Sequence, residues 1–238
     1  AWALHRTLVY ELAFLFADDS SGRGRSLLDA CRALAGFLQA HGDADALFGS
    51  FRAQTPHTLV LHGVETAIGT IAVALADGLS SVRALALIGS AAAVADAGLL
   101  SLPRAVRERR GELTSMERKM IQQHPDLSLR KMPAFGIVAP EAQRAVRHHH
   151  ERWDGTGYPA HLTGHAIPVE ARYVAIADTY STLTVPRRGM PRLSRGDALR
   201  EMAQSVGQFD PALLRILVQL LSGRGHSATE ADTPPNGA

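Results

Sequence analysis

Residues 147–159 read RHHHERWDGTGYP, three consecutive histidines followed by a glycine-rich loop. Neutral imidazole is the side chain that most often binds metals in proteins. Adjacent helical residues point about 100° apart, so His149 and His150 can reach one ion only near a helix end or where several helices converge. The glycines and the proline of DGTGYP supply such an end, because they favour a turn and stop a helix. The stretch predicts a helix that ends in metal-binding histidines beside a shaped loop.

Other histidines and an aspartate occur on predicted helices far from this stretch, namely His62, His124 and Asp178. Taken singly, a histidine is more often a surface residue or a satisfied core residue than a metal ligand. Ligands from distant helices can meet only in the core of a bundle, where metal sites of helical proteins are built. Convergence of these residues with the histidine run would therefore indicate a bundle.

The composition favours helices packed on helices. Hydrophobic residues make up 46% of the 238 residues and aromatic residues only 5%, so the core must consist largely of Ala, Leu and Val. Helical periodicity recurs along the chain, whereas no alternating strand pattern and no internal repeat are found. The periodic segments are 2–18, 26–42, 58–79, 82–98, 113–124, 139–152, 168–184 and 210–223. The predicted fold class is all-α.

Three regions are expected along the chain. Residues 1–50 form an N-terminal helical region of unknown role, and residues 51–222 form the main domain. Residues 223–238 have too few apolar side chains to bury and are expected to be a disordered tail.

The net charge and the cysteine content indicate which partners and which cellular compartment the sequence fits. The formal net charge of +2 and a pI of about 9.0 do not indicate a stripe for binding nucleic acid polymers. The single Cys31 cannot form an internal disulfide, and no leader is seen, so we expect a cytoplasmic protein. Apolar runs are expected to break before the roughly 18 residues of a membrane span, which predicts no membrane segment.

The histidine stretch also carries a family resemblance. HHERWDGTGYP, followed by LTGHAIPVEARYVAIADTYSTLT, closely resembles the signature of the HD-GYP family, cyclic di-GMP phosphodiesterases of the larger HD group of metal-dependent phosphohydrolases. The resemblance runs from about Thr55 to Leu221 and includes GELTSMERKMIQQHP and GQFDPALL. It implies an HD-superfamily multi-helix bundle with residues 1–50 as an N-terminal helical extension.

The resemblance implies a set of site residues. Members of this family hold two or three metal ions, commonly iron or manganese, so a divalent cofactor is expected here. The metal ligands at the matching positions are His62, Asp96, His124, His149, His150 and Asp178. Asp96 is also the expected catalytic residue. Gly157 and Tyr158 of the signature tripeptide, together with Arg187, are expected to bind substrate, although Arg187 is about as readily explained as solvated surface.

Four positions depart from the family pattern. Alignment back from Pro103 places Ala95 where relatives have the histidine of the His-Asp pair. Leu99 stands in place of a lysine that faces the substrate phosphate, Ser181 in place of an aspartate, and Met190 in place of a basic residue. Four functional positions have therefore become small or apolar.

These departures affect the two expected metal positions differently. The complete set comprises Asp96, His124, His149 and His150. The weakened set comprises His62, Asp96 and Asp178, and Ala95 replaces its fourth ligand. We expect one intact site and one weakened site, which impairs catalysis because paired ions normally activate the nucleophile and hold both oxygens of the displacement.

Two functions remain open at this point. The chain is either a signalling module without turnover, which binds cyclic di-GMP or a GGDEF-type partner protein through the GYP loop, or an active cyclic di-GMP phosphodiesterase. The four departures favour the first, and the complete metal set favours the second. A second copy of the chain is a further candidate partner.

Overall fold

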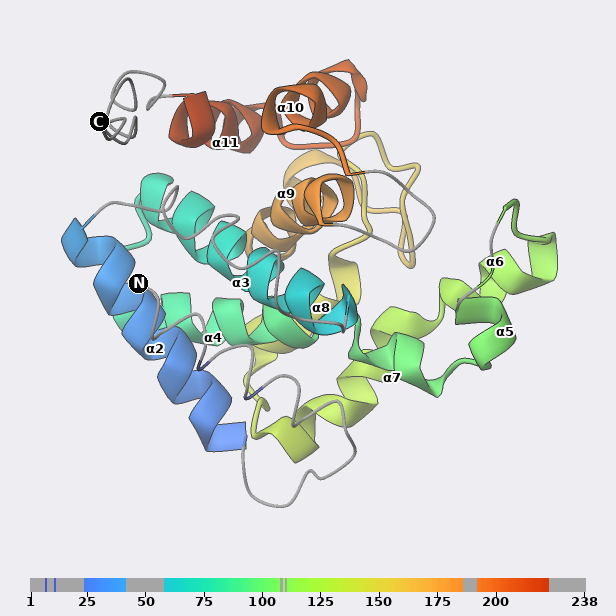
Figure 1. Cartoon of the computed structure of the whole chain (residues 1–238), viewed down its shortest axis with the longest axis horizontal. Helices are drawn as coiled ribbons and strands as arrows, with labels where there is room; N and C mark the ends of the chain where they lie inside the picture. Colours follow the sequence, from blue (N-terminus) through green and yellow to red (C-terminus); the bar gives the residue numbers. More distant parts are fainter. Residues whose placement is uncertain are drawn as a thin grey trace, which may run out of the picture.

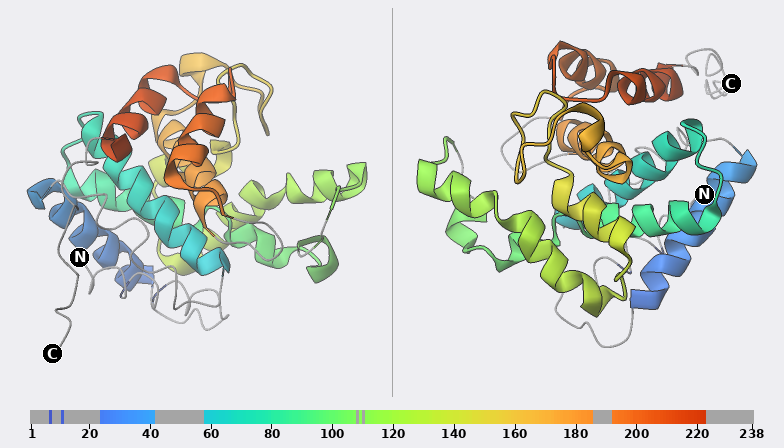
Figure 2. Two further views of the ribbon diagram at one scale, coloured as in Figure 1. Left: turned by 45° about the horizontal axis from the view of Figure 1, so that its top comes forward. Right: turned by 180° about the vertical axis from the view of Figure 1, so that it is seen from behind.

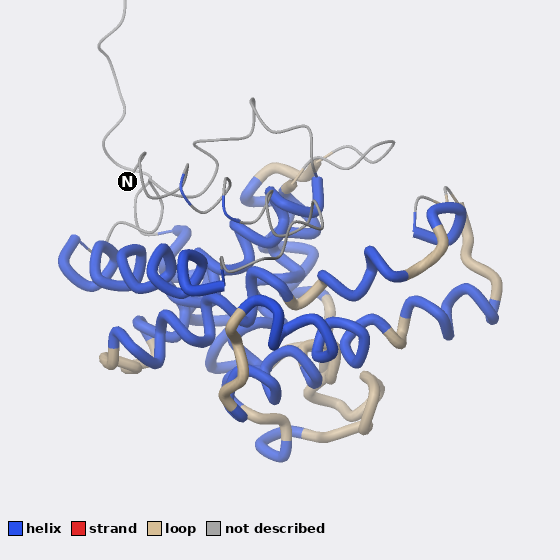
Figure 3. Tube along the Cα trace, turned by 90° about the horizontal axis from the view of Figure 1, so that it is seen from below, coloured by secondary structure: helices blue, strands red, loops and turns tan. Residues whose placement is uncertain are grey.

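The computed structural model describes residues 24–41, 58–107, 109, 111–185 and 192–222, together with positions 7 and 11. Across these residues the chain is built from helices and connecting loops, as Figure 3 shows. Their strand-like pairing is limited to one isolated bridge, between Asp154 and Thr163. The all-α fold class is confirmed.

The helices follow one another along the chain with short connections (Figure 1). The α-helices are α2 (Gly24–His41), α3 (Thr58–Ala76), α4 (Val82–Val94), α5 (Arg104–Arg107), α6 (Ser115–Ile121), α7 (His124–Lys131), α8 (Pro140–His148), α9 (Val169–Thr184), α10 (Arg195–Gln204) and α11 (Pro211–Ser222). The 3-10 helices are η1 (Ala97–Ser101), η2 (Met132–Phe135) and η3 (Gly164–Ala166).

Helix α3 forms the centre of the bundle. It packs against α4 and α9, while α8 packs on α4 and α9 and α2 covers the other side of α4 (Figures 1 and 2). Helix α3 is buried on nearly every side, which explains its almost wholly apolar sequence. Its buried polar exceptions include His62, which faces α9 and forms part of the site.

Helix α2 belongs to the same core as the central helices. Its Leu27, Leu34 and Leu38 are at most 1% exposed and pack in one hydrophobic cluster with residues of α3 and α4. The predicted domain boundary at residue 50 stays a prediction, although α2 packs as part of the bundle. The tail predicted at 223–238 lies outside the described residues, as does nearly all of the helix predicted at 2–18.

Two stretches of the chain are more apolar than expected. Residues 59–76 and 82–101 are each long and apolar enough to cross a membrane by length and composition, so the expectation that such runs stop short is wrong. Within the bundle, 83% of the first window and 67% of the second are buried. Burial in the bundle explains their composition without a membrane.

Several predicted helices end earlier than their periodicity suggests. The helix predicted over 82–98 stops at Val94, and the chain then turns through Asp96 into η1. The segment predicted over 113–124 begins at a Thr114–Glu117 capping box, as expected, but α6 ends at Ile121. Both breaks place a predicted metal ligand at the end of a helix, because His124 opens α7.

Candidate metal centre

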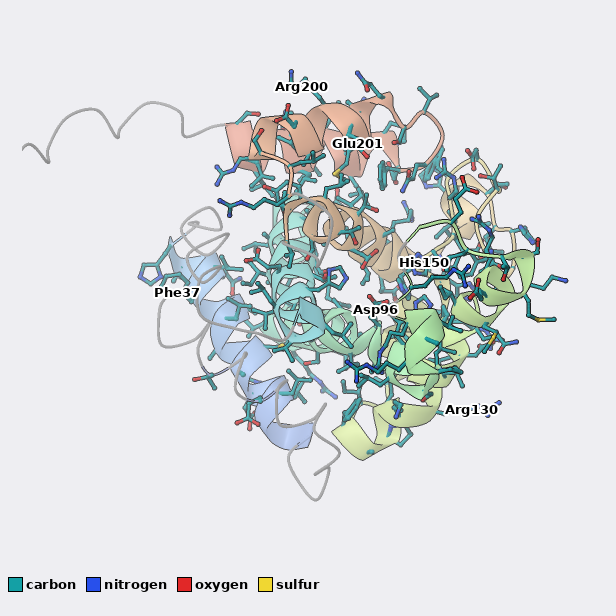
Figure 4. All side chains as sticks on the ribbon, turned by 45° about the vertical axis from the view of Figure 1, so that its right-hand side comes forward. Phe37, Asp96, Arg130, His150, Arg200 and Glu201 are labelled. Atoms are coloured by element: carbon teal, nitrogen blue, oxygen red, sulfur yellow. The ribbon has the colours of Figure 1, made fainter. Side chains whose placement is uncertain are left out.

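The six predicted metal ligands meet in the middle of the bundle. They come from α3, the turn after α4, the start of α7, the end of α8 and α9. Figure 4 labels Asp96 and His150, whose side chains approach one another between these elements, while Arg130 of α7 lies at the outside. The bundle therefore supplies the convergence that the scattered sequence positions predicted.

Four of these residues form one group, which we call the four-donor group: Asp96, His124, His149 and His150. Each can offer a ligand atom within 4.8 Å of the others. The His124 Nε2 atom lies 3.3 Å from that of His149 and 3.2 Å from that of His150. An Asp96 Oδ1 atom lies 3.1 Å from His124 Nε2.

Backbone carbonyls fix the direction of two of these rings. His124 Nδ1 donates to the carbonyl of Ile121 at 2.7 Å, and His149 Nδ1 donates to that of Val146 at 2.6 Å. A carbonyl oxygen can only accept, so Nδ1 carries the hydrogen in both rings and Nε2 points into the group. When these rings are neutral, each inward Nε2 atom carries a lone pair and no hydrogen. A cation can bind to these lone pairs.

The two remaining predicted ligands, His62 and Asp178, form a three-donor group together with Asp96. His62 Nε2 lies 2.8 Å from Asp178 Oδ1 and 3.2 Å from Asp96 Oδ2. On the other side of the ring, His62 Nδ1 lies 2.9 Å from the Ser181 hydroxyl. Asp96 thus contributes one carboxylate oxygen to each group and links them.

Ala95 adds no donor to this second group. Its side chain is a methyl group that is 2% exposed, directly before Asp96 at the end of α4. Ser181, where a carboxylate was expected, supplies only the hydroxyl beside His62. The three-donor group is therefore smaller than the four-donor group.

The electrostatics of the site depend on two carboxylates, the buried Asp178 and the half-buried Asp96, that lie among the imidazoles. Burial lowers the pKa of His62, but hydrogen bonds and charges of Asp178 and Asp96 outweigh it and raise that pKa to about 9. Burial raises the pKa of Asp96, yet hydrogen bonds from His124, His149 and His62 bring it well below its usual range. Burial lowers the pKa of His150 to about 3, so that ring is neutral. The two carboxylates thus stabilise a positive charge on His62.

The arrangement fits a divalent cation. Metal–nitrogen bonds of about 2.0–2.1 Å place neighbouring ligand atoms roughly 3 Å apart, close to the spacing of the inward nitrogens. Imidazole with carboxylate is a donor set used for iron, manganese and zinc. The geometry is thus suited to a metal without selecting which one.

The GYP loop is built directly against the histidine turn. The Tyr158 amide donates to the His150 carbonyl at 3.1 Å. A side-chain carbon on Gly157 would lie 2.3 Å from the Arg152 nitrogen and 2.5 Å from the His150 oxygen, so only glycine fits. The Tyr158 ring stacks on the His150 ring, with centroids 4.9 Å apart. Gly157 and Tyr158 therefore lie beside the four-donor group, and their role in binding substrate stays a prediction.

Glu151 is a buried residue between the histidines and the GYP loop. Its carboxylate accepts from the amides of Ala160 at 2.7 Å and Leu162 at 3.0 Å, and it lies 3.4 Å from His148 Nδ1. It anchors the loop beyond the GYP tripeptide. A charged residue between the histidines and the glycines was the available signal.

Ser128 is another buried polar residue near the site, and its role was not predicted from the sequence. Its hydroxyl donates to the Ala95 carbonyl at 2.5 Å and accepts from the Gly98 amide at 2.8 Å. The serine is fully buried, one helical turn after His124. Its spacing of four from that histidine placed it on the same helix face, which is the signal that sequence reading could have used.

The other predicted residues have mixed outcomes. Arg187 and Met190 lie outside the described residues. Leu99 is half-buried in η1 and brings no charge to the site. Trp153 packs edge-on against His165 and lies under the Arg172 guanidinium.

Comparison with known families now places the chain. A family model described as an HD domain matches residues 55–213, most of the chain. The chain belongs to the HD domain family. Together with the Gly157–Tyr158–Pro159 tripeptide, its relatives place it in the HD-GYP family, so the resemblance seen in the sequence is confirmed.

Similar proteins include two curated bacterial phosphodiesterases. The chain is 34% identical over 136 residues to a cyclic di-GMP phosphodiesterase of Vibrio cholerae serotype O1, a match covering 54% of this chain and 27% of that protein. It is 35% identical over 155 residues to the cyclic di-GMP phosphodiesterase response regulator RpfG of Xanthomonas campestris pv. campestris, covering 62% of this chain and 41% of that protein. The chain thus matches well under half of each relative.

A solved HD-GYP-type structure has the same fold. An HDG"Y"P protein from Bdellovibrio bacteriovorus superposes with a TM-score of 0.74 at 18% identity, covering 92% of this chain and 71% of that one. This likeness supports the helical architecture of the HD-GYP bundle.

Proposed function

We propose that the chain is an HD-GYP module of cytoplasmic cyclic di-GMP signalling that binds one metal ion firmly and hydrolyses cyclic di-GMP slowly or not at all. The observation that carries this proposal is the buried methyl group of Ala95 beside Asp96, in a group that retains three donors. The names of the relatives support cyclic di-GMP as the ligand.

The residues of the site suit a phosphodiester substrate. Bound divalent ions supply Lewis-acid polarisation of a phosphate and a nucleophile near neutral pH. Asp96 holds the two donor groups in fixed relation through its two oxygens. Tyr158 stands over His150, and burial together with the charges of Asp96 and Asp178 raises the pKa of its phenol. Tyr158 therefore stays neutral and can donate a hydrogen bond to a phosphate oxygen.

Three replacements weaken this site as a catalyst. Ala95 removes a ligand from the three-donor group, and Ser181 presents a hydroxyl where the family has a carboxylate. Leu99 presents an apolar side chain where an ammonium would neutralise a phosphate. Charge-assisted contacts of that kind stabilise transition states in water-excluded sites, so their loss slows turnover.

The alternative is an active cyclic di-GMP phosphodiesterase. The complete four-donor group with its carbonyl-fixed histidines favours it. A partner of GGDEF type reached through the GYP loop, and pairing of two copies, remain further predictions for the signalling role.

The deciding experiment measures metal content, cyclic di-GMP binding and product formation on the same preparation. The assays are run anaerobically with iron and with manganese, because oxidised iron mimics inactivity.

We expect the protein to bind cyclic di-GMP but to form little product. Combining Ala95→His, Leu99→Lys and Ser181→Asp should restore part of the hydrolysis. The triple variant should exceed the sum of the single ones, since the groups act on one transition state. Brisk turnover by the unmodified chain would instead establish the phosphodiesterase.

A further inference from the structure

The turn that carries Asp96 lacks its usual cap. Asp96 occupies the N-cap position of η1, where an aspartate side chain normally accepts a hydrogen bond from an amide of the first turn. Here the Asp96 side chain makes no such bond, because both of its oxygens face the histidines of the two donor groups. Something else must satisfy the free amide.

The Ser128 hydroxyl satisfies it from another helix. It accepts from the Gly98 amide at 2.8 Å, two residues after Asp96, which is the bond that the aspartate would have made. It also donates to the Ala95 carbonyl at 2.5 Å, one of the carbonyls left without a helical partner at the end of α4. One hydroxyl therefore holds the chain on both sides of Asp96.

Close packing makes this arrangement specific. A side-chain carbon on Gly98 would lie 2.2 Å from the His124 carbonyl oxygen and 2.6 Å from the Ser128 nitrogen. The turn rests directly on the backbone of the first turn of α7. Because Ser128 lies one helical turn after His124 on α7, the serine fixes Asp96 relative to His124, whose Nε2 lies 3.1 Å from the carboxylate.

We propose that Ser128 is a positioning residue that takes over the capping role of Asp96 and so leaves the aspartate carboxylate for the metal. This inference rests on the metal site of the proposed function. Without the serine hydroxyl, the Asp96 carboxylate stands at the N-cap position, from which it can accept from the Gly98 amide. The carboxylate then turns back to cap η1 and leaves the histidines.

The test is a titration with Co²⁺, followed by visible absorption, which reports both affinity and coordination geometry. Ser128→Ala should weaken Co²⁺ binding about 10- to 100-fold, the usual effect of removing a group that orients a ligand. Ser128→Thr keeps the hydroxyl and should retain most of the affinity. The matched control is Ser90→Ala, since Ser90 is equally buried but donates to Ala86 within its own helix.

A second measurement needs no metal. Thermal unfolding of the metal-free protein is compared for Ser128→Ala in the wild-type and Asp96→Ala backgrounds. The loss in Tm should be larger without Asp96, because the aspartate can no longer replace the serine as the cap.

The outcomes separate this inference from the proposed function. Co²⁺ affinity in Ser128→Ala equal to that in Ser90→Ala would overturn the positioning role, as would equal losses in Tm in the two backgrounds. If the wild-type protein bound no Co²⁺, the proposed metal site would be wrong, and the Tm comparison would still decide whether Ser128 and Asp96 exchange the cap.

Discussion

The two donor groups share Asp96 but differ in how their imidazoles are held. In the four-donor group, backbone carbonyls orient His124 and His149, so the inward nitrogens are fixed by the helices themselves. In the three-donor group, His62 is oriented by the Ser181 hydroxyl, and its other nitrogen already pairs with two carboxylates. A hydroxyl can donate or accept, so it does not fix the ring as a carbonyl does. The first group is therefore prepared for a metal, whereas the members of the second largely satisfy one another's hydrogen bonds.

The largest expected effect comes from removing the residue common to both groups. Asp96→Ala should reduce metal affinity more than about a hundredfold, beyond the usual cost of losing a group that only orients a ligand. Adding a chelator should then no longer lower the Tm of this variant. In the wild type, free ion about a hundredfold above Kd contributes about 2.7 kcal/mol to stability, which a chelator removes. Elemental analysis and calorimetry check both points, and an unchanged metal content would show that Asp96 is not a ligand.

A second test separates neighbouring histidines in the four-donor group. His150→Ala should lose the metal and the stabilisation that the metal provides, because a bound ion links several helices only in the folded state. His148→Ala should leave metal content nearly unchanged, since its ring lies by Glu151, away from the other donors. Equal loss of metal in the two variants would show that the assignment of His150, rather than His148, to the site is wrong.

A third test sharpens the contrast by completing the smaller group. We expect wild-type protein to hold close to one ion per chain and Ala95→His to hold close to two. The larger side chain enters a buried position, so the metal-free variant should be less stable by about 1–3 kcal/mol. Elemental analysis with anomalous scattering counts the ions. Two fully occupied sites in the unmodified protein would remove the difference between the groups.

The smallest effect concerns the loop beside the four-donor group. Gly157→Ala should destabilise the protein by about 1–3 kcal/mol, because the added methyl meets backbone atoms of the histidine turn. Gly36→Ala is the matched control. That helical position has no atom within 4 Å of the added carbon, so this change should stabilise by about 0.5–1 kcal/mol. Denaturant unfolding measures the change in the free energy of unfolding for both variants. Changes of the same sign would contradict the close approach at Gly157.

Much of the fold and the donor set could be predicted from the sequence. Apolar periodicity predicted most helices, and the family resemblance around HHERWDGTGYP gave six predicted ligands, which the bundle brings together. The end of α4 could not be predicted, because an alanine-rich segment favours continuing the helix. The turn at Asp96 depends on a hydroxyl from Ser128, 33 residues beyond the carbonyl that it bonds. Local propensity contains no information about such a partner.

Glu151 and α10 show the same limit. The sequence placed Glu151 beside the histidines, but its bonds to Ala160 and Leu162 depend on the path of the intervening loop. Helix α10 begins at a Ser194 cap that accepts from Asp197, a short-range signal without a strong apolar stripe to draw attention to it.

The hydrogen bond between His62 and Asp178 joins residues 116 positions apart in the chain. During synthesis, the first ligand is made long before the last, and no partial chain that ends before α9 has both. The three-donor group can therefore be complete only after Asp178 has been made, whereas all members of the four-donor group precede α9. A chain truncated before Asp178 would keep every donor of the four-donor group but would lack most of the packing of α9 against α3 and α8.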